Sequence, residues 1–129
     1  MAAGDIDRDG DLDLVVTHVN QPVSLLRNES SDSNNWISVQ LTGTLSARNP
    51  VGASIVLETN SGQRLLRLHK SGGSYASSSD RPVHFGIGSH EISRMTVMWP
   101  SGHKQTFQNI AVNQSVAVVE GRDSLTAIP

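Results

Sequence analysis

The chain has 129 residues, of which 36% are hydrophobic and 17% charged, and its formal net charge is −2. This length and composition predict one globular domain, residues 1–129, and exclude a disordered chain or a coiled coil. No apolar run approaches the roughly 20 residues of a membrane span, and the scattered Lys and Arg residues argue against nucleic acid as a partner.

The sequence lacks cysteine and a signal-peptide pattern, and the first of these absences excludes several kinds of site. The chain has no cysteine, which excludes disulfides, thiol nucleophiles and thiolate metal sites. Its opening residues, MAAGD, lack the basic and apolar regions of a signal peptide. A piece of a longer secreted protein would lack them as well, so this second absence says little about location.

The first predicted element is an acidic loop, GDIDRDGDLDLVV (residues 4–16), in which aspartates occupy alternate positions. If the first aspartate is position 1, carboxylates fall at positions 1, 3, 5 and 9, and Gly10 stands where such a loop must turn sharply. Ca²⁺ takes about six to eight hard oxygen ligands. The spacing therefore predicts a structural calcium site, in which Asp11 also offers its backbone carbonyl. The predicted ligands are Asp5, Asp7, Asp9, Asp11 and Asp13.

Two other interpretations of this loop are weaker. An EF-hand needs a glutamate at position 12, where Val16 stands, and its flanks should be helical rather than strand-like. A solvated acidic tail is the usual meaning of a charge run. The regular spacing, the glycine at the bend and the apolar strand that follows favour calcium.

Strands are predicted for the rest of the chain, because short alternating runs rich in β-branched residues are separated by turn residues. These runs cover residues 11–19, 22–28, 36–42, 53–59, 63–70, 81–88, 94–99, 104–110 and 115–121. No stretch has the spacing of an amphipathic helix. The pattern predicts an all-β protein, an antiparallel β-sandwich of immunoglobulin-like or jelly-roll-like type, with the calcium-loop hairpin packed on it as extra strands.

Alternation along these strands assigns their faces. The predicted core residues are Ile37, Val39, Leu41, Val83, Phe85, Ile87, Met95, Val97 and Trp99. Trp36, Ser38 and Gln40 lie on the opposite face of their strand, and His84 points outward. Arg67 and His69 alternate onto the face opposite Leu66 and Leu68. We expect the face that carries Arg67 and His69 to be solvated.

A binding face is predicted around the few aromatic residues. Trp36 shares a face with hydrogen-bonding side chains, an arrangement typical of a platform for a sugar ring; alternatively, it packs under the N-terminal hairpin. Tyr75 either stacks on a ligand or tucks into the edge of the sandwich. The candidate ligand-binding residues are Trp36, Gln40, Arg67, His69, Tyr75, Asp80, Arg81 and His84.

Catalytic patterns are not found. The five histidines lack zinc-ligand spacing, no G-x-S-x-G elbow occurs, and no glycine-rich stretch precedes a helix, as a phosphate loop would. A pair of glycosidase carboxylates remains open, because such residues need not be close in sequence. We expect the protein not to be an enzyme.

Two parts of the chain resemble known families. GDIDRDGDLDLVV, followed by LLRNE, resembles the FG-GAP/VCBS calcium repeat, normally one blade of a β-propeller. NNWISVQLTGTLSARNPVGASI, SGGSYASSSD, VHFGIG, MTVMWPSGHKQTFQNIAVNQ and VAVVEG occur in order and resemble the ASPIC/UnbV domain. These resemblances imply a calcium loop and hairpin over residues 4–29 and a sandwich over residues 34–122. A single repeat cannot form a propeller.

The resemblance also implies a function. Such domains occur in secreted or cell-surface proteins, and no catalytic machinery is attributed to them. We expect a non-catalytic, calcium-stabilised carbohydrate-binding module of a larger secreted, extracellular protein, recognising a polysaccharide such as a β-glucan. The alternative is an extracellular protein–protein adhesion or assembly module, which would present an apolar patch or an open sheet edge.

Overall fold

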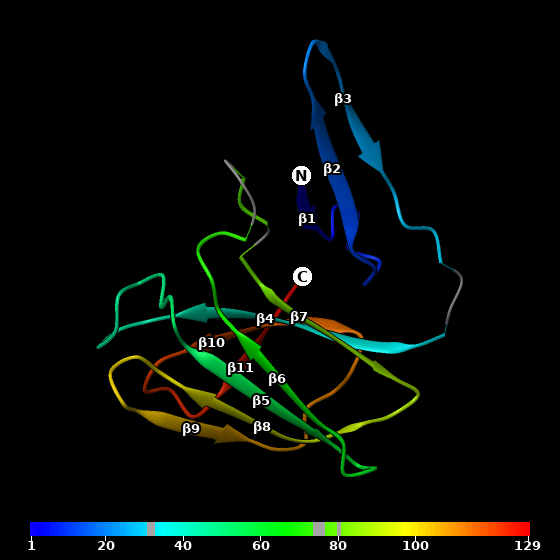
Figure 1. Ribbon diagram of the computed structural model, residues 1–129. Coiled ribbons are helices and arrows are strands. Elements are labelled where there is room, and N and C mark those ends of the chain that lie inside the picture. The colour runs from blue at the N-terminus through cyan, green and yellow to red at the C-terminus, as the bar shows by residue number, and fades with distance from the viewer. Residues whose placement is uncertain (31–32, 74–76, 80) are drawn as a thin grey trace.

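The computed structural model describes residues 1–30, 33–73, 77–79 and 81–129, and this part of the chain is built from strands and connecting loops (Figure 1). No helix in it is long and apolar enough to cross a membrane. The strands form three sheets, two of four strands and one of three. The prediction of an all-β sandwich is confirmed.

Each predicted strand is present, with ends that differ by a few residues, and two short strands at the ends of the chain were not predicted. The strands are β1 (Ala2–Gly4), β2 (Asp13–His18), β3 (Gln21–Leu26), β4 (Asn35–Thr42), β5 (Ser54–Thr59), β6 (Arg64–Leu68), β7 (Val83–Gly88), β8 (Ile92–Met98), β9 (Lys104–Phe107), β10 (Gln114–Val119) and β11 (Leu125–Ile128).

The two four-stranded sheets form the sandwich. One has the order β11-β10-β4-β7 and the other β6-β5-β8-β9, so the chain crosses between the layers after β4, β6, β7 and β9. These crossings bring β10 back beside β4 in the same direction, and the two pair in parallel. The remaining pairs are antiparallel. This one parallel pair makes an otherwise antiparallel sandwich mixed.

The core lies between these two sheets. The nine predicted core residues are all buried, and they are joined by Ala53, Ile55, Leu57, Ile92, Phe107, Ile110, Val116 and Val118. Trp99 is only 3% exposed and precedes the predicted β8–β9 turn, where Gly102 takes a φ of 86°. Buried and less buried residues alternate strictly along β5 and β7, which is why the hydrophobic alternation in the sequence predicts these strands.

On β6 the predicted faces are reversed. Leu66 and Leu68 are 59% and 52% exposed, whereas Arg67 pairs in register with the buried Ile55 and lies over the Phe85 ring at 5.9 Å. His69, which follows β6, is buried. The strand lies at the edge of its sheet, where a long arginine can extend its stem along the core and keep its charge near solvent. The expectation of a solvated face is therefore wrong for His69, which is buried, whereas Arg67 is exposed as expected.

The N-terminal strands form a sheet of their own in the order β1-β2-β3. Figure 1 shows the β2–β3 hairpin rising away from the sandwich, with the loop between β1 and β2 at its foot. These strands make no ladder with the sandwich sheets, so they pack on the sandwich as a separate sheet. Their position therefore depends on contacts made by the acidic loop and on two hydrogen bonds near β1, from Ala3 N–H to Ser79 Oγ and from Ser77 Oγ to the Met1 carbonyl oxygen.

A buried carboxylate fixes the loop that follows β4. Glu120 is 2% exposed, and its Oε2 accepts hydrogen bonds from the backbone N–H groups of Thr44, Leu45 and Ser46, at 2.9, 2.9 and 2.7 Å. Its Oε1 accepts from the hydroxyls of Ser46 and Ser101. Burial alone would raise the pKa of Glu120, but these hydrogen bonds lower it to about 2.

Glu120→Gln should lower the melting temperature at neutral pH, because an amide cannot accept from all five donors and brings two donors of its own. The ionised carboxylate adds stability that is complete above the ordinary pKa of 4.5 and is lost as the pH falls toward 2. The difference in unfolding free energy between the two proteins should therefore shrink as the pH falls from about 5 to 2. Urea unfolding across that range measures it; a constant difference would contradict this role.

Candidate metal centre and the groove beside it

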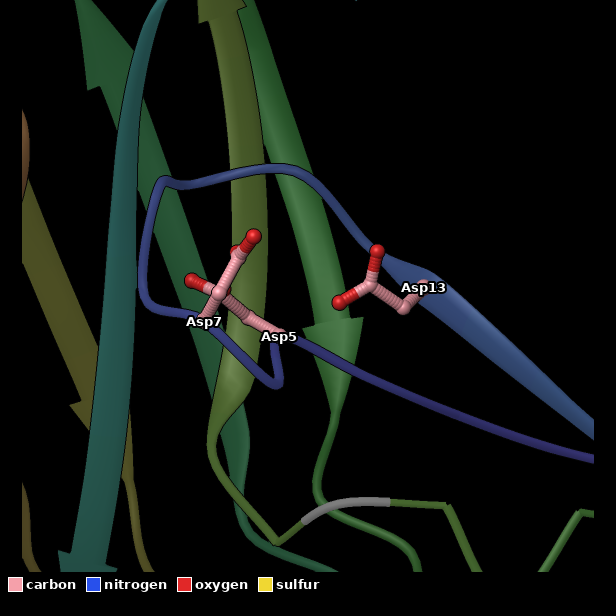
Figure 2. A group of neighbouring side chains, drawn as sticks. All are labelled: Asp5, Asp7 and Asp13. Carbon is pink, nitrogen blue, oxygen red and sulfur yellow. The ribbon is translucent and has the colours of Figure 1, made fainter. Parts of the chain in front are cut away.

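Three of the five predicted metal ligands come together. Asp5, Asp7 and Asp13 each offer a carboxylate oxygen, and these oxygens lie within 4.8 Å of one another. Figure 2 shows Asp5 and Asp7 on the turn and Asp13 at the beginning of β2, with its carboxylate directed toward the other two. The alternate spacing of the aspartates and the bend at Gly10, whose φ is 99°, produce this convergence.

Asp13 ties the loop to the hairpin. Its Oδ2 accepts a hydrogen bond from the backbone N–H of Ile6 at 3.0 Å, and its Oδ1 accepts one from Asn28 at 2.8 Å. The hydrogen bonds from Asn28 and Ile6 lower the pKa of Asp13. This buried carboxylate therefore stays ionised and connects the start of the loop, the start of β2 and the residues after β3.

Asp5 is less well satisfied. Its Oδ2 accepts a hydrogen bond from the backbone N–H of Gly10 at 3.1 Å, whereas its Oδ1 is buried and has no hydrogen-bond partner in the described residues. Burial raises the pKa of Asp5, against the lowering effect of the Gly10 and Arg8 backbone hydrogen bonds. A buried carboxylate oxygen without a donor is costly unless a cation faces it.

The other acidic side chains of the loop have different partners. Asp7 Oδ2 forms an ion pair with Arg27 at 2.6 Å, and Asp9 Oδ1 accepts from the backbone N–H of Asp11 at 2.9 Å. The carboxylates of Asp9 and Asp11 are not part of the three-residue cluster. The hard oxygen donors of Asp5, Asp7 and Asp13 suit Ca²⁺, and Asp5 Oδ1 supplies an unused ligand atom.

Trp36 lies at the junction of this loop and the sandwich. A side chain on Gly10 would place its Cβ 2.0 Å from Trp36 Nε1, so the indole lies directly on the glycine backbone. Trp36 also stacks on His84, with ring centroids 5.9 Å apart and an angle of 22° between the planes. Of the two hypotheses for Trp36, packing under the N-terminal segment describes most of its contacts.

His84 lies on the outer face of β7, as predicted, but it is half-covered rather than solvated. Burial lowers its pKa, while the charges of Asp5 and Asp11 act in the opposite direction. The loop, Trp36 and His84 thus form one stack on the outer face of the sheet.

A groove of about 360 Å³ lies beside this stack. It is lined on one side by Asp5 and Arg8 of the acidic loop and on the other by Trp36, Ser38 and Gln40 of β4. The C-terminal residues close one end, where Arg8 Nη1 donates a hydrogen bond to the Pro129 carbonyl oxygen at 2.8 Å. The predicted polar face of β4 therefore lines a groove, together with residues that the sequence analysis did not single out.

The remaining candidate ligand residues divide into three groups. Gln40 continues into a second hollow, where it is joined by His69 and Arg81. Arg67 lies elsewhere, over Phe85. Tyr75 and Asp80 lie outside the described residues. Arg8 was missed because its hydrogen bond to the last residue of the chain has no local signature in the sequence.

Gly10→Ala should detach the acidic loop from the sandwich. Alanine at a φ of 99° is strained, and its Cβ would also collide with the Trp36 ring. Gly52→Ala is the matched control, because Gly52 has a φ of 94° with nothing within 4 Å of the added Cβ. We expect Gly10→Ala to destabilise the protein by clearly more than the roughly 1 kcal/mol of backbone strain that both share, and to expose residues 5–13 to proteolysis. Equal effects of the two substitutions would show that the Trp36 contact is unimportant.

Comparison with known proteins identifies the family of the chain. Residues 43–125, more than half of the chain, match the family described as ASPIC and UnbV. The chain is 34% identical over 119 residues to cartilage acidic protein 1 of Homo sapiens and of Mus musculus, and 35% identical over 104 residues to that of Xenopus tropicalis. The human and mouse matches cover 90% of the chain, so they include much of the segment before residue 43, but the chain spans only 18% of the length of those relatives. The chain belongs to the ASPIC and UnbV family.

Proposed function

We propose that this chain is a non-catalytic, calcium-stabilised binding module of an extracellular protein, and that its ligand is a polysaccharide. The observation that carries the proposal is the groove between the acidic loop and β4, which is lined mainly by polar side chains beside a tryptophan. An ion held by the loop would fix one wall of this groove. The two functions, metal binding and ligand binding, are therefore physically linked.

The proposal of calcium rests on the converging carboxylates. Without a cation, Asp5, Asp7 and Asp13 repel one another, and Arg27, which pairs with Asp7 and also acts on Asp13, supplies one positive charge for the three carboxylates. Ca²⁺ between the three oxygens would remove this repulsion and satisfy Asp5 Oδ1. Because Gly10 both donates to Asp5 and touches Trp36, order in the loop is transmitted to the groove wall.

Chelation should lower the melting temperature in calorimetry, because an ion bound only to the folded state stabilises it by about 2.7 kcal/mol at roughly a hundredfold excess over Kd. Asp5→Asn should abolish the difference between calcium and chelator, since asparagine keeps an acceptor for the Gly10 N–H but removes the charge. The control is Asp123→Asn in the exposed β10–β11 turn, which should keep that difference. A wild-type melting temperature that is unaffected by chelation would contradict calcium stabilisation.

The proposal of a polysaccharide rests on the shape and chemistry of the groove. Trp36 offers an apolar side chain, and Ser38, Gln40 and Asn113 offer hydrogen-bonding groups along the same groove. Sugars present apolar ring faces and many hydroxyls, and they bind shallow polar grooves of this kind through several weak contacts. The relatives are named for cartilage, a tissue with abundant extracellular matrix, which favours an extracellular location.

The proposal of a non-catalytic module rests on the partners and positions of the acidic side chains. Glu120 accepts five hydrogen bonds, and Glu58 pairs with Arg64 and Arg94 at 3.2 and 3.7 Å. Asp5 is the only acidic residue among the described residues that line the groove. A glycosidase needs two carboxyl groups facing the scissile bond, and this groove does not offer such a pair.

Affinity electrophoresis in gels that contain soluble glucans, xylans or mannans tests the ligand. At least one polymer should retard the protein. Gln40→Ala should weaken that retardation by about three- to tenfold, the effect of one lost hydrogen bond, whereas Gln108→Ala, an exposed glutamine after β9, should not. If no polysaccharide retards the protein with or without calcium, the sugar proposal fails.

A protein–protein adhesion module is the second candidate, and one observation favours it. Leu66, Leu68 and Met98 are 59%, 52% and 52% exposed. Leu68 and Met98 flank Ser54, and Leu66 pairs with Val56, so the three side chains lie on one face of neighbouring strands β6, β5 and β8. A contiguous apolar patch of this kind is typical of a contact surface. Replacing both leucines with serine should leave glycan retardation unchanged and abolish capture of a protein partner if this candidate is correct.

A further inference from the structure

A second hollow adjoins the groove at Gln40. It has a volume of about 240 Å³ and is lined by residues from four parts of the chain: β4, the loop that follows it, the residue after β6 and a residue shortly before β7. Its polar and charged lining residues are Gln40, Thr42, Arg48, Asn49, His69 and Arg81. None of the described residues that line it is acidic. In contrast, Asp5 lines the groove on the other side of Gln40.

Asn49 is held so that its amide can donate a hydrogen bond. His69 Nε2 lies 2.6 Å from Asn49 Oδ1. The amide oxygen can only accept, so Nε2 carries the proton and the Asn49 NH₂ group is left as a donor. His69 is itself fixed, because its backbone N–H donates to Ala53 and its carbonyl accepts from Gly52, at 2.8 and 2.9 Å.

Two guanidinium groups supply the charge of the hollow. The side chain of Arg48 has no ion pair or hydrogen bond within the part of the chain that the structure describes. Arg81 lies close enough to His69 that its charge helps burial to lower the pKa of that imidazole. Burial and the Arg81 charge therefore disfavour the charged form of His69, and Arg48 supplies the positive charge of the hollow that is not paired within the described residues.

The Arg48 backbone is positioned before any ligand arrives. Its carbonyl accepts a hydrogen bond from the Gly43 N–H at 3.2 Å, and residues 44–46 of the same loop are fastened to the buried Glu120. A fixed backbone reduces the conformational entropy that binding must overcome. Arginine and amide donors on such a frame are suited to a planar or tetrahedral oxyanion.

We propose that this hollow takes the anionic group of an acidic polysaccharide, a sulfate ester or a uronate carboxylate, whose chain lies along the groove. The inference rests on the proposed function, and it replaces a neutral β-glucan with an acidic polymer as the ligand class. Gln40 borders both hollows, so a chain held beside Trp36 would pass Gln40 to reach Arg48 and Asn49.

Matched polymers test the charge. Dextran is compared with dextran sulfate, and methyl-esterified with free polygalacturonate, by affinity electrophoresis and by titration calorimetry. The experiments are done in about 0.15 M salt, where charges more than about 8 Å apart are largely screened. Each acidic polymer that fits should bind at least about tenfold more tightly than its neutral counterpart, since charge-assisted hydrogen bonds are stronger than neutral ones. The first pair reports on sulfate esters and the second on carboxylates.

Arg48→Gln should weaken binding of the preferred acidic polymer by about tenfold and leave neutral polymers unaffected. Arg94→Gln is the control, because it removes the same charge from β8, where Arg94 pairs in register with Glu58 at the other end of β5. Both variants should keep the wild-type circular dichroism spectrum and melt cooperatively.

The outcomes separate this inference from the proposed function. Equal effects of Arg48→Gln and Arg94→Gln, or equal affinity for charged and neutral polymers, would overturn the anionic hollow. Gln40-dependent binding of neutral glucans alone would also overturn it, while the proposed polysaccharide function would stand. If no polymer binds, both fail.

Discussion

A tryptophan ring that lies against a glycine joins the two parts of this protein. Sheet β1-β2-β3 shares no ladder with the sandwich, so the acidic loop is positioned by contacts such as that between Gly10 and Trp36. Trp36 is in turn supported by His84 and exchanges backbone and side-chain hydrogen bonds with Asn113. The cluster of carboxylates, the groove wall and the outer face of β4 have their present arrangement because no side chain separates residue 10 from the indole.

The fold of the sandwich could be predicted from the sequence because its strands are buried on one face only. Period-two alternation identified the core residues of β4, β7 and β8 and the turn after Trp99. Alternation failed on β6, since Leu66 and Leu68 look like core residues and only the register with β5 shows that they face outward. β1 and β11 are short and owe their existence to pairing with β2 and β10, which no local pattern reveals. The parallel β4–β10 pair is equally non-local.

The candidate site also has one part that the sequence predicts and one part that it does not. The carboxylate cluster could be predicted because its residues lie within nine positions of one another, and spacing in sequence there becomes convergence in space. Asp9 and Asp11 share that spacing, yet a local hydrogen bond keeps Asp9 outside the cluster. The second hollow could not be predicted, because Arg48, His69 and Arg81 come from separate segments. Arg67 and His69 were chosen for their residue type, and only one of them lines a hollow.

The parallel β4–β10 pair affects the order in which the chain folds. Residues 37–42 must wait for residues 114–119 before their strand has its parallel neighbour, and Trp36 gains its bonds to Asn113 only at the same stage. Pairing over such a separation is slow, and during synthesis it is delayed until the late segment has left the ribosome. The acidic loop is synthesised before the sandwich strands, but Trp36 beneath it gains its hydrogen bonds to Asn113 only after most of them. A nascent chain halted before residue 113 would thus lack the hydrogen bonds that hold Trp36 under the acidic loop.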